Sequence, residues 1–186
     1  MIGKGKSISH GVAALEYDLA KEINGQAVAT EIARHELYGC TGAEMVQEMK
    51  PYHIDFPNVK NNCLRFEVSP SIEESATFTD ADWAELGNDF MQRMGLANHQ
   101  YIIIRHSGTE SKKEQAHLHI LANRVSLSGE LYRDNWIGKK ATEAANAIAK
   151  ERNFVQSQDI GKVNKAEIKE AMDGVLKKMQ GFDFTK

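Results

Sequence analysis

Residues 106–125 read HSGTESKKEQAHLHILANRV, and this stretch decides the fold that the sequence predicts. Apolar and polar side chains alternate along 116–125, which is typical of a β-strand with two different faces. The preceding run HQYIIIRH, residues 99–106, is rich in β-branched residues and ends where the polar segment 107–115 begins. Two strands joined by a polar loop predict an antiparallel hairpin.

Three of the seven histidines, His106, His117 and His119, lie within residues 106–125. Side chains two apart in a strand share a face, so His117 and His119 point away from the apolar face of their strand. Antiparallel pairing brings His106, at the end of the first strand, close to both. Polar groups in the middle of a sheet cost stability unless they find partners. Three neutral imidazoles with open positions left for water or substrate favour a divalent-metal or phosphate site over three structural histidines.

The remaining elements follow from periodicity and capping signals. The first helical pattern, 11–23, has an apolar stripe that leaves Tyr17 outside it. Thr41 with Glu44 three residues later predicts the start of another helix. We expect strands at 4–10, 64–69, 99–106 and 116–125, and helices at 11–23, 29–39, 41–52, 79–96, 135–154 and 164–179. This order predicts an α+β fold, a central and mainly antiparallel sheet with helices on one face.

Composition limits the function classes. The chain has 186 residues, which suits one domain with a sizeable core. It carries 23 Lys+Arg against 26 Asp+Glu, a net charge of −3, so a sequence-blind nucleic-acid coat is excluded and a polyanion must be held by a local patch. Two cysteines make no disulfide framework and indicate a reducing, cytoplasmic location. No apolar run approaches the ~18 residues of a membrane span, so we expect no membrane insertion.

Several separated motifs resemble one family. The triplet His117-Leu118-His119 matches the histidine–hydrophobic–histidine signature, and Asn123-Arg124 completes the pattern HxHxxxNR. His106 stands eleven residues upstream, and KSISHGVAALEY, residues 6–17, resembles an N-terminal motif in which a strand leads into a helix that ends on a tyrosine. In this order they are similar to the relaxases, or mobilisation nucleases, of the HUH endonuclease class, of the MobA/VirD2-like conjugative type.

The resemblance implies an HUH relaxase-like fold of the ferredoxin-like or palm type. It also implies a metal-dependent, site- and strand-specific DNA nickase acting at an origin of transfer in plasmid or transposon mobilisation. Tyr17 would form a covalent 5′-phosphotyrosyl intermediate, with His10 or a metal-bound hydroxide taking its proton. The expected cofactor is a divalent metal ion, Mg²⁺ or Mn²⁺ first and Zn²⁺ second. The expected partners are single-stranded DNA and accessory mobilisation proteins in a bacterial cytoplasm.

Each expected role has a residue. His106, His117 and His119 are the predicted metal ligands, and Glu67 and Asn123 are predicted to orient them through hydrogen bonds. For Glu67 a salt bridge to Arg65 or a solvated position is equally open. The predicted DNA-binding cations are Lys4, Lys6, Arg105, Lys112, Lys113 and Arg124.

Two other functions stay open at this point. One is a histidine-based phosphoesterase or nucleotide hydrolase, which needs no tyrosine. The other is a non-catalytic DNA-binding module of the same fold. We expect a relaxase-like nuclease domain at 1–155, with 156–186 as a helical extension packed on it or as the start of a following region.

Overall fold

The computed structural model describes residues 1–108 and 115–179. Its strands are β1 (Ile2–Ile8), β2 (Glu22–Ile23), β3 (Gln26–Ala27), β4 (Ala29–His35), β5 (Cys63–Ser69), β6 (His99–His106) and β7 (His117–Ser126). Its helices are α1 (Gly11–Leu19), α2 (Gly42–Met49), the 3-10 helix η1 (Lys50–His53), α3 (Ile72–Ser75), α4 (Asp80–Arg93), α5 (Ile137–Glu151) and α6 (Ser157–Met179). The α+β class and the predicted hairpin are confirmed.

Five strands form one antiparallel sheet in the order β1-β5-β7-β6-β4. The hairpin of β6 and β7 lies inside this sheet, with β5 and β1 on one side and β4 on the other. His106 pairs with His117, and Glu67 of β5 pairs with His119. The sheet therefore fixes the relative height of the residues that the sequence singled out.

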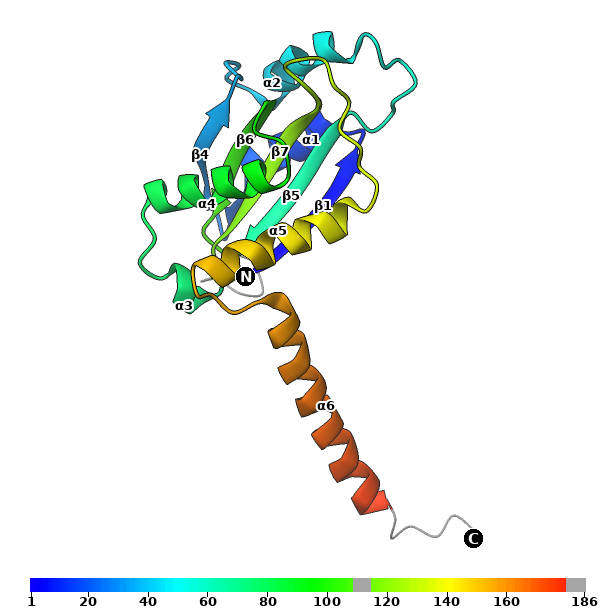
Figure 1. Cartoon of the computed structure of the whole chain (residues 1–186). Coiled ribbons are helices and arrows are strands. Elements are labelled where there is room, and N and C mark those ends of the chain that lie inside the picture. The colour runs from blue at the N-terminus through cyan, green and yellow to red at the C-terminus, as the bar shows by residue number, and fades with distance from the viewer. Residues whose placement is uncertain (109–114, 180–186) are drawn as a thin grey trace, which may run out of the picture.

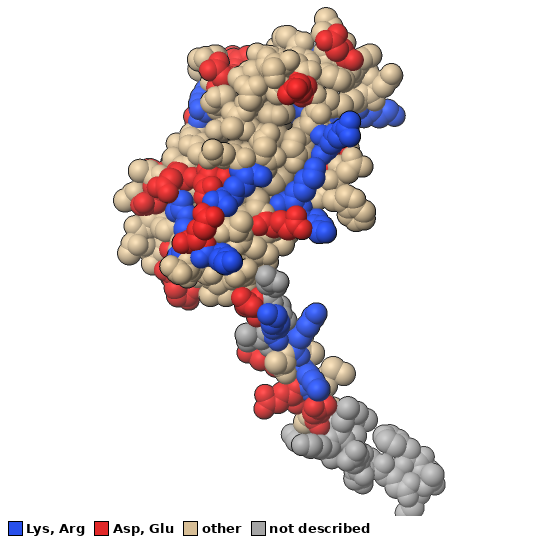
Figure 2. All heavy atoms as spheres, viewed as in Figure 1, with Lys and Arg blue, Asp and Glu red and all other residues tan. Residues whose placement is uncertain are grey.

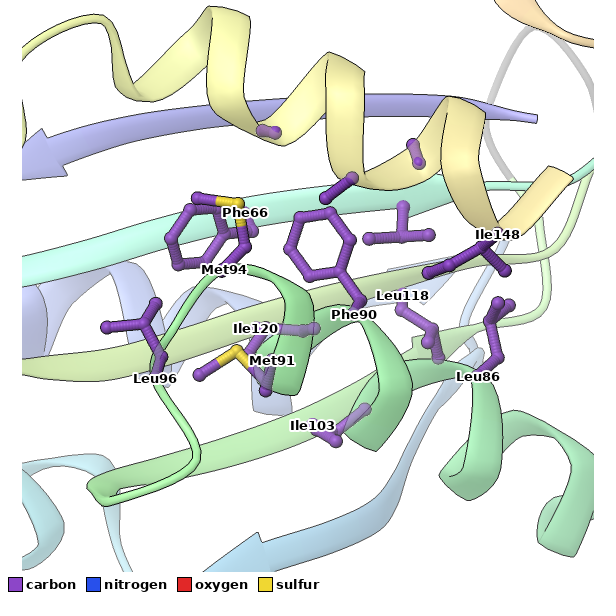
Figure 3. Close-up of a cluster of buried hydrophobic side chains, with 14 of the residues drawn as sticks. Phe66, Leu86, Phe90, Met91, Met94, Leu96, Ile103, Leu118, Ile120 and Ile148 are labelled. Carbon is purple, nitrogen blue, oxygen red and sulfur yellow. The ribbon is translucent and has the colours of Figure 1, made fainter. Parts of the chain in front are cut away.

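Helices cover both faces of the sheet, so the prediction of helices on one face is wrong. Figure 1 shows α4 and α5 crossing the near face and α1 lying behind the strands. The α4/α5 side buries Phe66, Phe90, Leu118 and Ile120, which are labelled in Figure 3. A second core on the other side joins α1 and α2 to the sheet through Leu15 and other apolar residues. The histidines indicated a polar face, but the same face also carries Ile102, Ile104 and Leu121, which α1 and α2 cover.

The edge strand β4 corrects another prediction, because residues 29–39 were expected to be helical. Ala29–His35 pairs with residues 101–106 of β6, with a register shift between Glu31 and Ala33. Since β6 is almost wholly buried, its backbone groups need partners on both edges, and β4 supplies them. Tertiary pairing outweighs the helical propensity of the Ala, Glu and Arg residues here.

The N-terminal helix ends earlier than predicted, at Leu19 in place of Ile23. Asn24 and Gly25 both have positive φ, 53° and 75°, and form the tight turn between β2 and β3. The buried positions of α1 are Gly11, Ala14, Leu15 and Asp18. The predicted apolar stripe is therefore rotated, and a carboxylate lies on the inner face of the helix.

The helices α2, α4 and α5 lie within a few residues of the predicted bounds, whereas α6 begins at Ser157 in place of residue 164. Thr41 and Glu44 form the predicted capping box at the start of α2. Figure 1 shows α6 extending away from the sheet, and its described side chains Ile168, Met172 and Val175 are exposed. In the described part of the chain, no helix has both the length and the apolar character needed to cross a membrane.

Candidate functional site

The hairpin brings the three predicted histidines together on the α1 side of the sheet. Ring centroids lie 5.3 Å apart for His106 and His117, 4.4 Å for His106 and His119, and 4.9 Å for His117 and His119. Each ring offers one nitrogen such that all three lie within 4.8 Å of one another. We call these residues the histidine triad. The predicted convergence of the rings is confirmed.

Backbone carbonyls set which nitrogen each ring has free. His117 Nδ1 donates to the Gln115 carbonyl at 3.1 Å, and His106 Nε2 donates to the Asp18 carbonyl at 2.7 Å. A neutral imidazole that donates through one nitrogen keeps a lone pair on the other, so His117 offers Nε2 and His106 offers Nδ1. The Nε2 atoms of His117 and His119 lie 3.1 Å apart, a spacing that two ligands of one ion can adopt.

Burial keeps two of the rings, those of His106 and His119, neutral. Desolvation, followed by the neighbouring His106 and His117 rings and the cations Arg65 and Lys21, lowers the pKa of His119 to about 2. Desolvation also lowers the pKa of His106. The contact of 4.0 Å between His119 Nδ1 and Asp18 Oδ1 is therefore a contact of a neutral ring and not an ion pair. Metal ligation needs a neutral imidazole, so His106 and His119 already have the charge state that a bound cation requires.

The donor set fits a divalent cation. Three imidazole nitrogens on two strands occupy one side of an ion and leave its other positions to water or substrate, as in catalytic metal sites. Two of the three rings are oriented by backbone carbonyls, the arrangement that fixes ligands in such sites. These observations support His106, His117 and His119 as the holding residues.

Tyr17 lies near the end of α1 that reaches the triad. Its side chain is 57% exposed, and its hydroxyl oxygen accepts a hydrogen bond of 2.6 Å from Lys21 Nζ. The charge of Lys21 also lowers the pKa of His106 and of His119, so the ammonium that contacts the phenol acts on two rings of the triad as well. Asp18, the next residue, contacts His106 directly. The phenol is thus accessible to a substrate, and the residue next to it in the sequence contacts the triad.

Asp18 and Arg65 are two residues of the site that sequence reasoning missed. The Asp18 carboxylate is 2% exposed and accepts from Arg65 Nε at 3.0 Å and from Arg65 Nη2 at 2.5 Å. Arg65 Nη2 also lies 3.3 Å from His119 Nδ1. The position of Asp18 three residues after Leu15, on the inner face of α1, was the available signal. Arg65 pairs with Asp18, and not with Glu67 as one alternative supposed.

The other predicted helpers lie in different places. His10 caps the far end of α1, seven residues and about 10 Å of helix from Tyr17, so it is not brought to the phenol. Glu67 lies beside His119 in the sheet, and its carboxylate accepts from Lys4 Nζ at 2.9 Å. The Asn123 amide bonds to Gln100, His53 and the Met49 carbonyl, away from the triad.

The predicted DNA-binding cations divide between two faces. Lys4 and Lys6, on the edge strand β1, line a cavity of about 190 Å³ together with Arg65, Glu67 and His119. Arg105 points to the opposite face and pairs with Asp80 of α4, so it cannot serve the same surface. Arg124 also serves the fold, because it pairs with Asp134 at 2.7 Å and donates to the Tyr132 carbonyl. Lys112 and Lys113 lie outside the described residues.

Comparison with known proteins gives one family. The family model of MobA/VirD2-like relaxases, nuclease domain, matches residues 17–154. No curated protein matches the chain. Among solved structures, the conjugative relaxase TrwC in a metal-bound complex with oriT DNA matches with 12% identity and a TM-score of 0.45, over 86% of this chain and 71% of that one.

Proposed function

The chain belongs to the MobA/VirD2-like relaxases, of which it carries the nuclease domain, and from this premise we propose that it nicks one strand of DNA at an origin of transfer. The proposed reaction is a divalent-metal-dependent transesterification with Tyr17 as nucleophile. The observation that carries the proposal is the contact between α1 and the triad, where the Asp18 carbonyl holds His106 next to the helix end that bears Tyr17.

The triad and Tyr17 would have different roles in this transesterification. A divalent cation held by His106, His117 and His119 supplies charge neutralisation and polarisation of the scissile phosphate when bound. The Tyr17 oxygen attacks phosphorus, a P–O bond to Tyr17 forms, and the bond from phosphorus to the 3′ oxygen breaks. The leaving oxygen takes a proton and becomes a free 3′ hydroxyl, while the 5′ phosphate stays on Tyr17.

Lys21 supports this step, because its ammonium donates to the phenol oxygen and stabilises the negative charge that develops there. The phenol proton passes to solvent water, since Tyr17 is exposed and His10 lies at the other end of α1. The tyrosyl phosphodiester conserves the energy of the broken bond, so a 3′ hydroxyl can attack it and reseal the strand. Lys4 and Lys6 are the proposed contacts to the DNA backbone.

The identity of the metal follows from its donors. Imidazole nitrogens suit first-row transition metals, whereas Mg²⁺ prefers oxygen ligands and keeps its waters. We therefore propose Mn²⁺ or Zn²⁺ ahead of Mg²⁺ at this site.

Nicking of a labelled pool of randomised single-stranded oligonucleotides tests the proposal. We expect cleavage with Mn²⁺, none with EDTA, and at least a 100-fold lower rate in His117→Ala, because the variant removes one ligand. His35→Ala, which removes a histidine of β4 outside the triad, is the matched control and should cleave like the wild type. Equal cleavage by His117→Ala and the wild type would remove the triad from the reaction.

A further inference from the structure

A buried ion pair lies directly behind the triad. Asp18 of α1 and Arg65 of β5 meet through two hydrogen bonds, and the Asp18 carboxylate is almost fully buried. The same guanidinium lies 3.3 Å from His119 Nδ1, and the same carboxylate lies 4.0 Å from that atom. The pair thus places one positive and one negative group next to the ring of a proposed metal ligand.

Stability alone gives a weak reason for this pair. Removing two charges from water costs several kcal/mol, roughly what their attraction returns, and apolar replacements are often as stable. The α1 side of the sheet also holds an apolar core, which includes Leu15 and Leu121. An apolar pair would fit this core, so the charges call for an explanation in the site.

The two charges act on a cation in opposite directions. A guanidinium beside a ligand ring repels a divalent cation, and the low dielectric of a buried site strengthens that repulsion. The Asp18 carboxylate cancels the charge of Arg65. Asp18 also holds His106 through its backbone carbonyl, so it touches the surroundings of two of the three rings.

Resting on the proposed function, we propose that Asp18 is a positioning residue of the metal centre, which neutralises Arg65 behind His119 and ties the Tyr17 end of α1 to the triad. Arg65 keeps the buried carboxylate on this side of the ring and away from the ion. The pair therefore sets the cation affinity of the site and is not only a link between α1 and β5.

Two substitutions that break the same pair separate this role from a structural one. Asp18→Asn leaves the Arg65 charge uncompensated next to His119, so Mn²⁺ affinity should fall by about tenfold or more. Arg65→Gln leaves a carboxylate next to the ring, so Mn²⁺ affinity should stay equal or rise. A purely structural pair would weaken binding in both variants alike. Asp134→Asn, which breaks the ion pair of Arg124 away from the triad, should leave the affinity unchanged.

The measurement is titration of the metal-free full chain with MnCl₂ by calorimetry, with the absorption spectrum of bound Co²⁺ as a second readout and thermal melting as the folding control. Equal loss in Asp18→Asn and Arg65→Gln overturns this inference and leaves the proposed function standing. A wild-type chain that takes up neither ion overturns both. If Asp18→Asn does not melt cooperatively, Asp18→Glu replaces it: retained affinity supports the inference, and a loss as large as in a triad variant contradicts it.

Discussion

At the scale of single residues, the site depends on histidines that stay neutral inside a sheet. His106 and His119 are deprived of water by α1 and by each other, and both have a lowered pKa. A neutral imidazole in the folded chain is ready for a metal, but it makes the metal-free chain sensitive to acid. This sensitivity is measurable without any activity.

We predict that the metal-free chain loses stability as the pH falls below about 6.5, the pKa of an unfolded histidine. The folded pKa of His119 is about 2, so between these values the unfolded chain binds a proton that the folded chain does not. The free energy of unfolding then falls by about 1.4 kcal/mol per pH unit for each such ring. Urea denaturation with EDTA at pH 7.5, 6 and 5 measures it.

The variant His119→Asn isolates the contribution of one ring. Its free energy of unfolding should fall less steeply with pH than that of the wild type, by about 1.4 kcal/mol per unit below pH 6. His99 and other groups titrate in both proteins and cancel in the comparison. Identical slopes in the two proteins would show that His119 is not held neutral by the fold.

The sequence predicts the triad because strand alternation is a strict geometric rule. Once 99–106 and 116–125 are recognised as a hairpin, the faces and the pairing of His106 with His117 follow. The Asp18–Arg65 pair does not follow in this way. Its partners are 47 residues apart, and their meeting depends on the rotation of α1 about its axis, which the weak amphipathic pattern of that helix leaves undetermined.

At the scale of elements, close backbone contacts hold the edge strand β1 against α5. A Cβ atom added at Gly3 would lie 2.4 Å from the Ala141 carbonyl oxygen and 2.6 Å from Ala145 Cβ. Gly3 has no side chain and Ala141 and Ala145 have small ones, so the helix lies directly on the strand. The opposite face of β1 carries Lys4 and Lys6 of the candidate site.

We predict that Gly3→Ala lowers the free energy of unfolding by about 1–3 kcal/mol, because the neighbouring backbone has to move. Gly138→Ala, in helix α5 on the other side of this contact, is the matched control. Its added Cβ would meet only the Gly5 carbonyl oxygen, at 3.5 Å, so stability should be unchanged or slightly higher. Chemical denaturation measures both. Equal effects would mean that α5 does not approach β1 as closely as described.

The elements that sequence reasoning misplaced have physical explanations. Strand β4 contains residues that favour helices, and only the need of β6 for a second partner strand selects the extended form. The end of α1 was readable, since Asn24-Gly25 is a strong tight-turn signal that the helical pattern through Ile23 obscured. Local sequence patterns therefore identify elements with clear periodicity. They do not identify a segment such as β4, whose conformation depends on pairing with another strand.

At the scale of the whole molecule, charge is mixed. Figure 2 shows basic and acidic side chains interspersed over the α4/α5 face and along α6, in keeping with the net charge of −3. The proposed contacts to DNA are therefore local ones, Lys4 and Lys6 of β1 on the other face. The cytoplasmic location and accessory mobilisation proteins stay predictions from the resemblance.

We predict a shallow salt dependence of single-stranded DNA binding. Each phosphate contact contributes about 0.7 to the slope of log K against log salt concentration. The double variant Lys4→Ala/Lys6→Ala should therefore reduce this slope by about 1.4. Fluorescence anisotropy at salt concentrations between about 50 and 200 mM measures it. Lys139→Ala/Lys150→Ala, on α5 across the sheet, should keep the wild-type slope. An unchanged slope in the β1 variant would place the DNA elsewhere.

In the proposed reaction, α1 presents Tyr17 to a phosphodiester held at the triad. Incubation of the full chain with a labelled pool of single-stranded oligonucleotides and Mn²⁺, followed by a denaturing gel, tests it most directly. We expect a covalent DNA–protein band that is absent in Tyr17→Phe and retained in Tyr38→Phe, a control at another exposed tyrosine. A band that persists in Tyr17→Phe, or cleavage without any band in the wild type, would contradict it, and the second result would favour a histidine-based phosphoesterase.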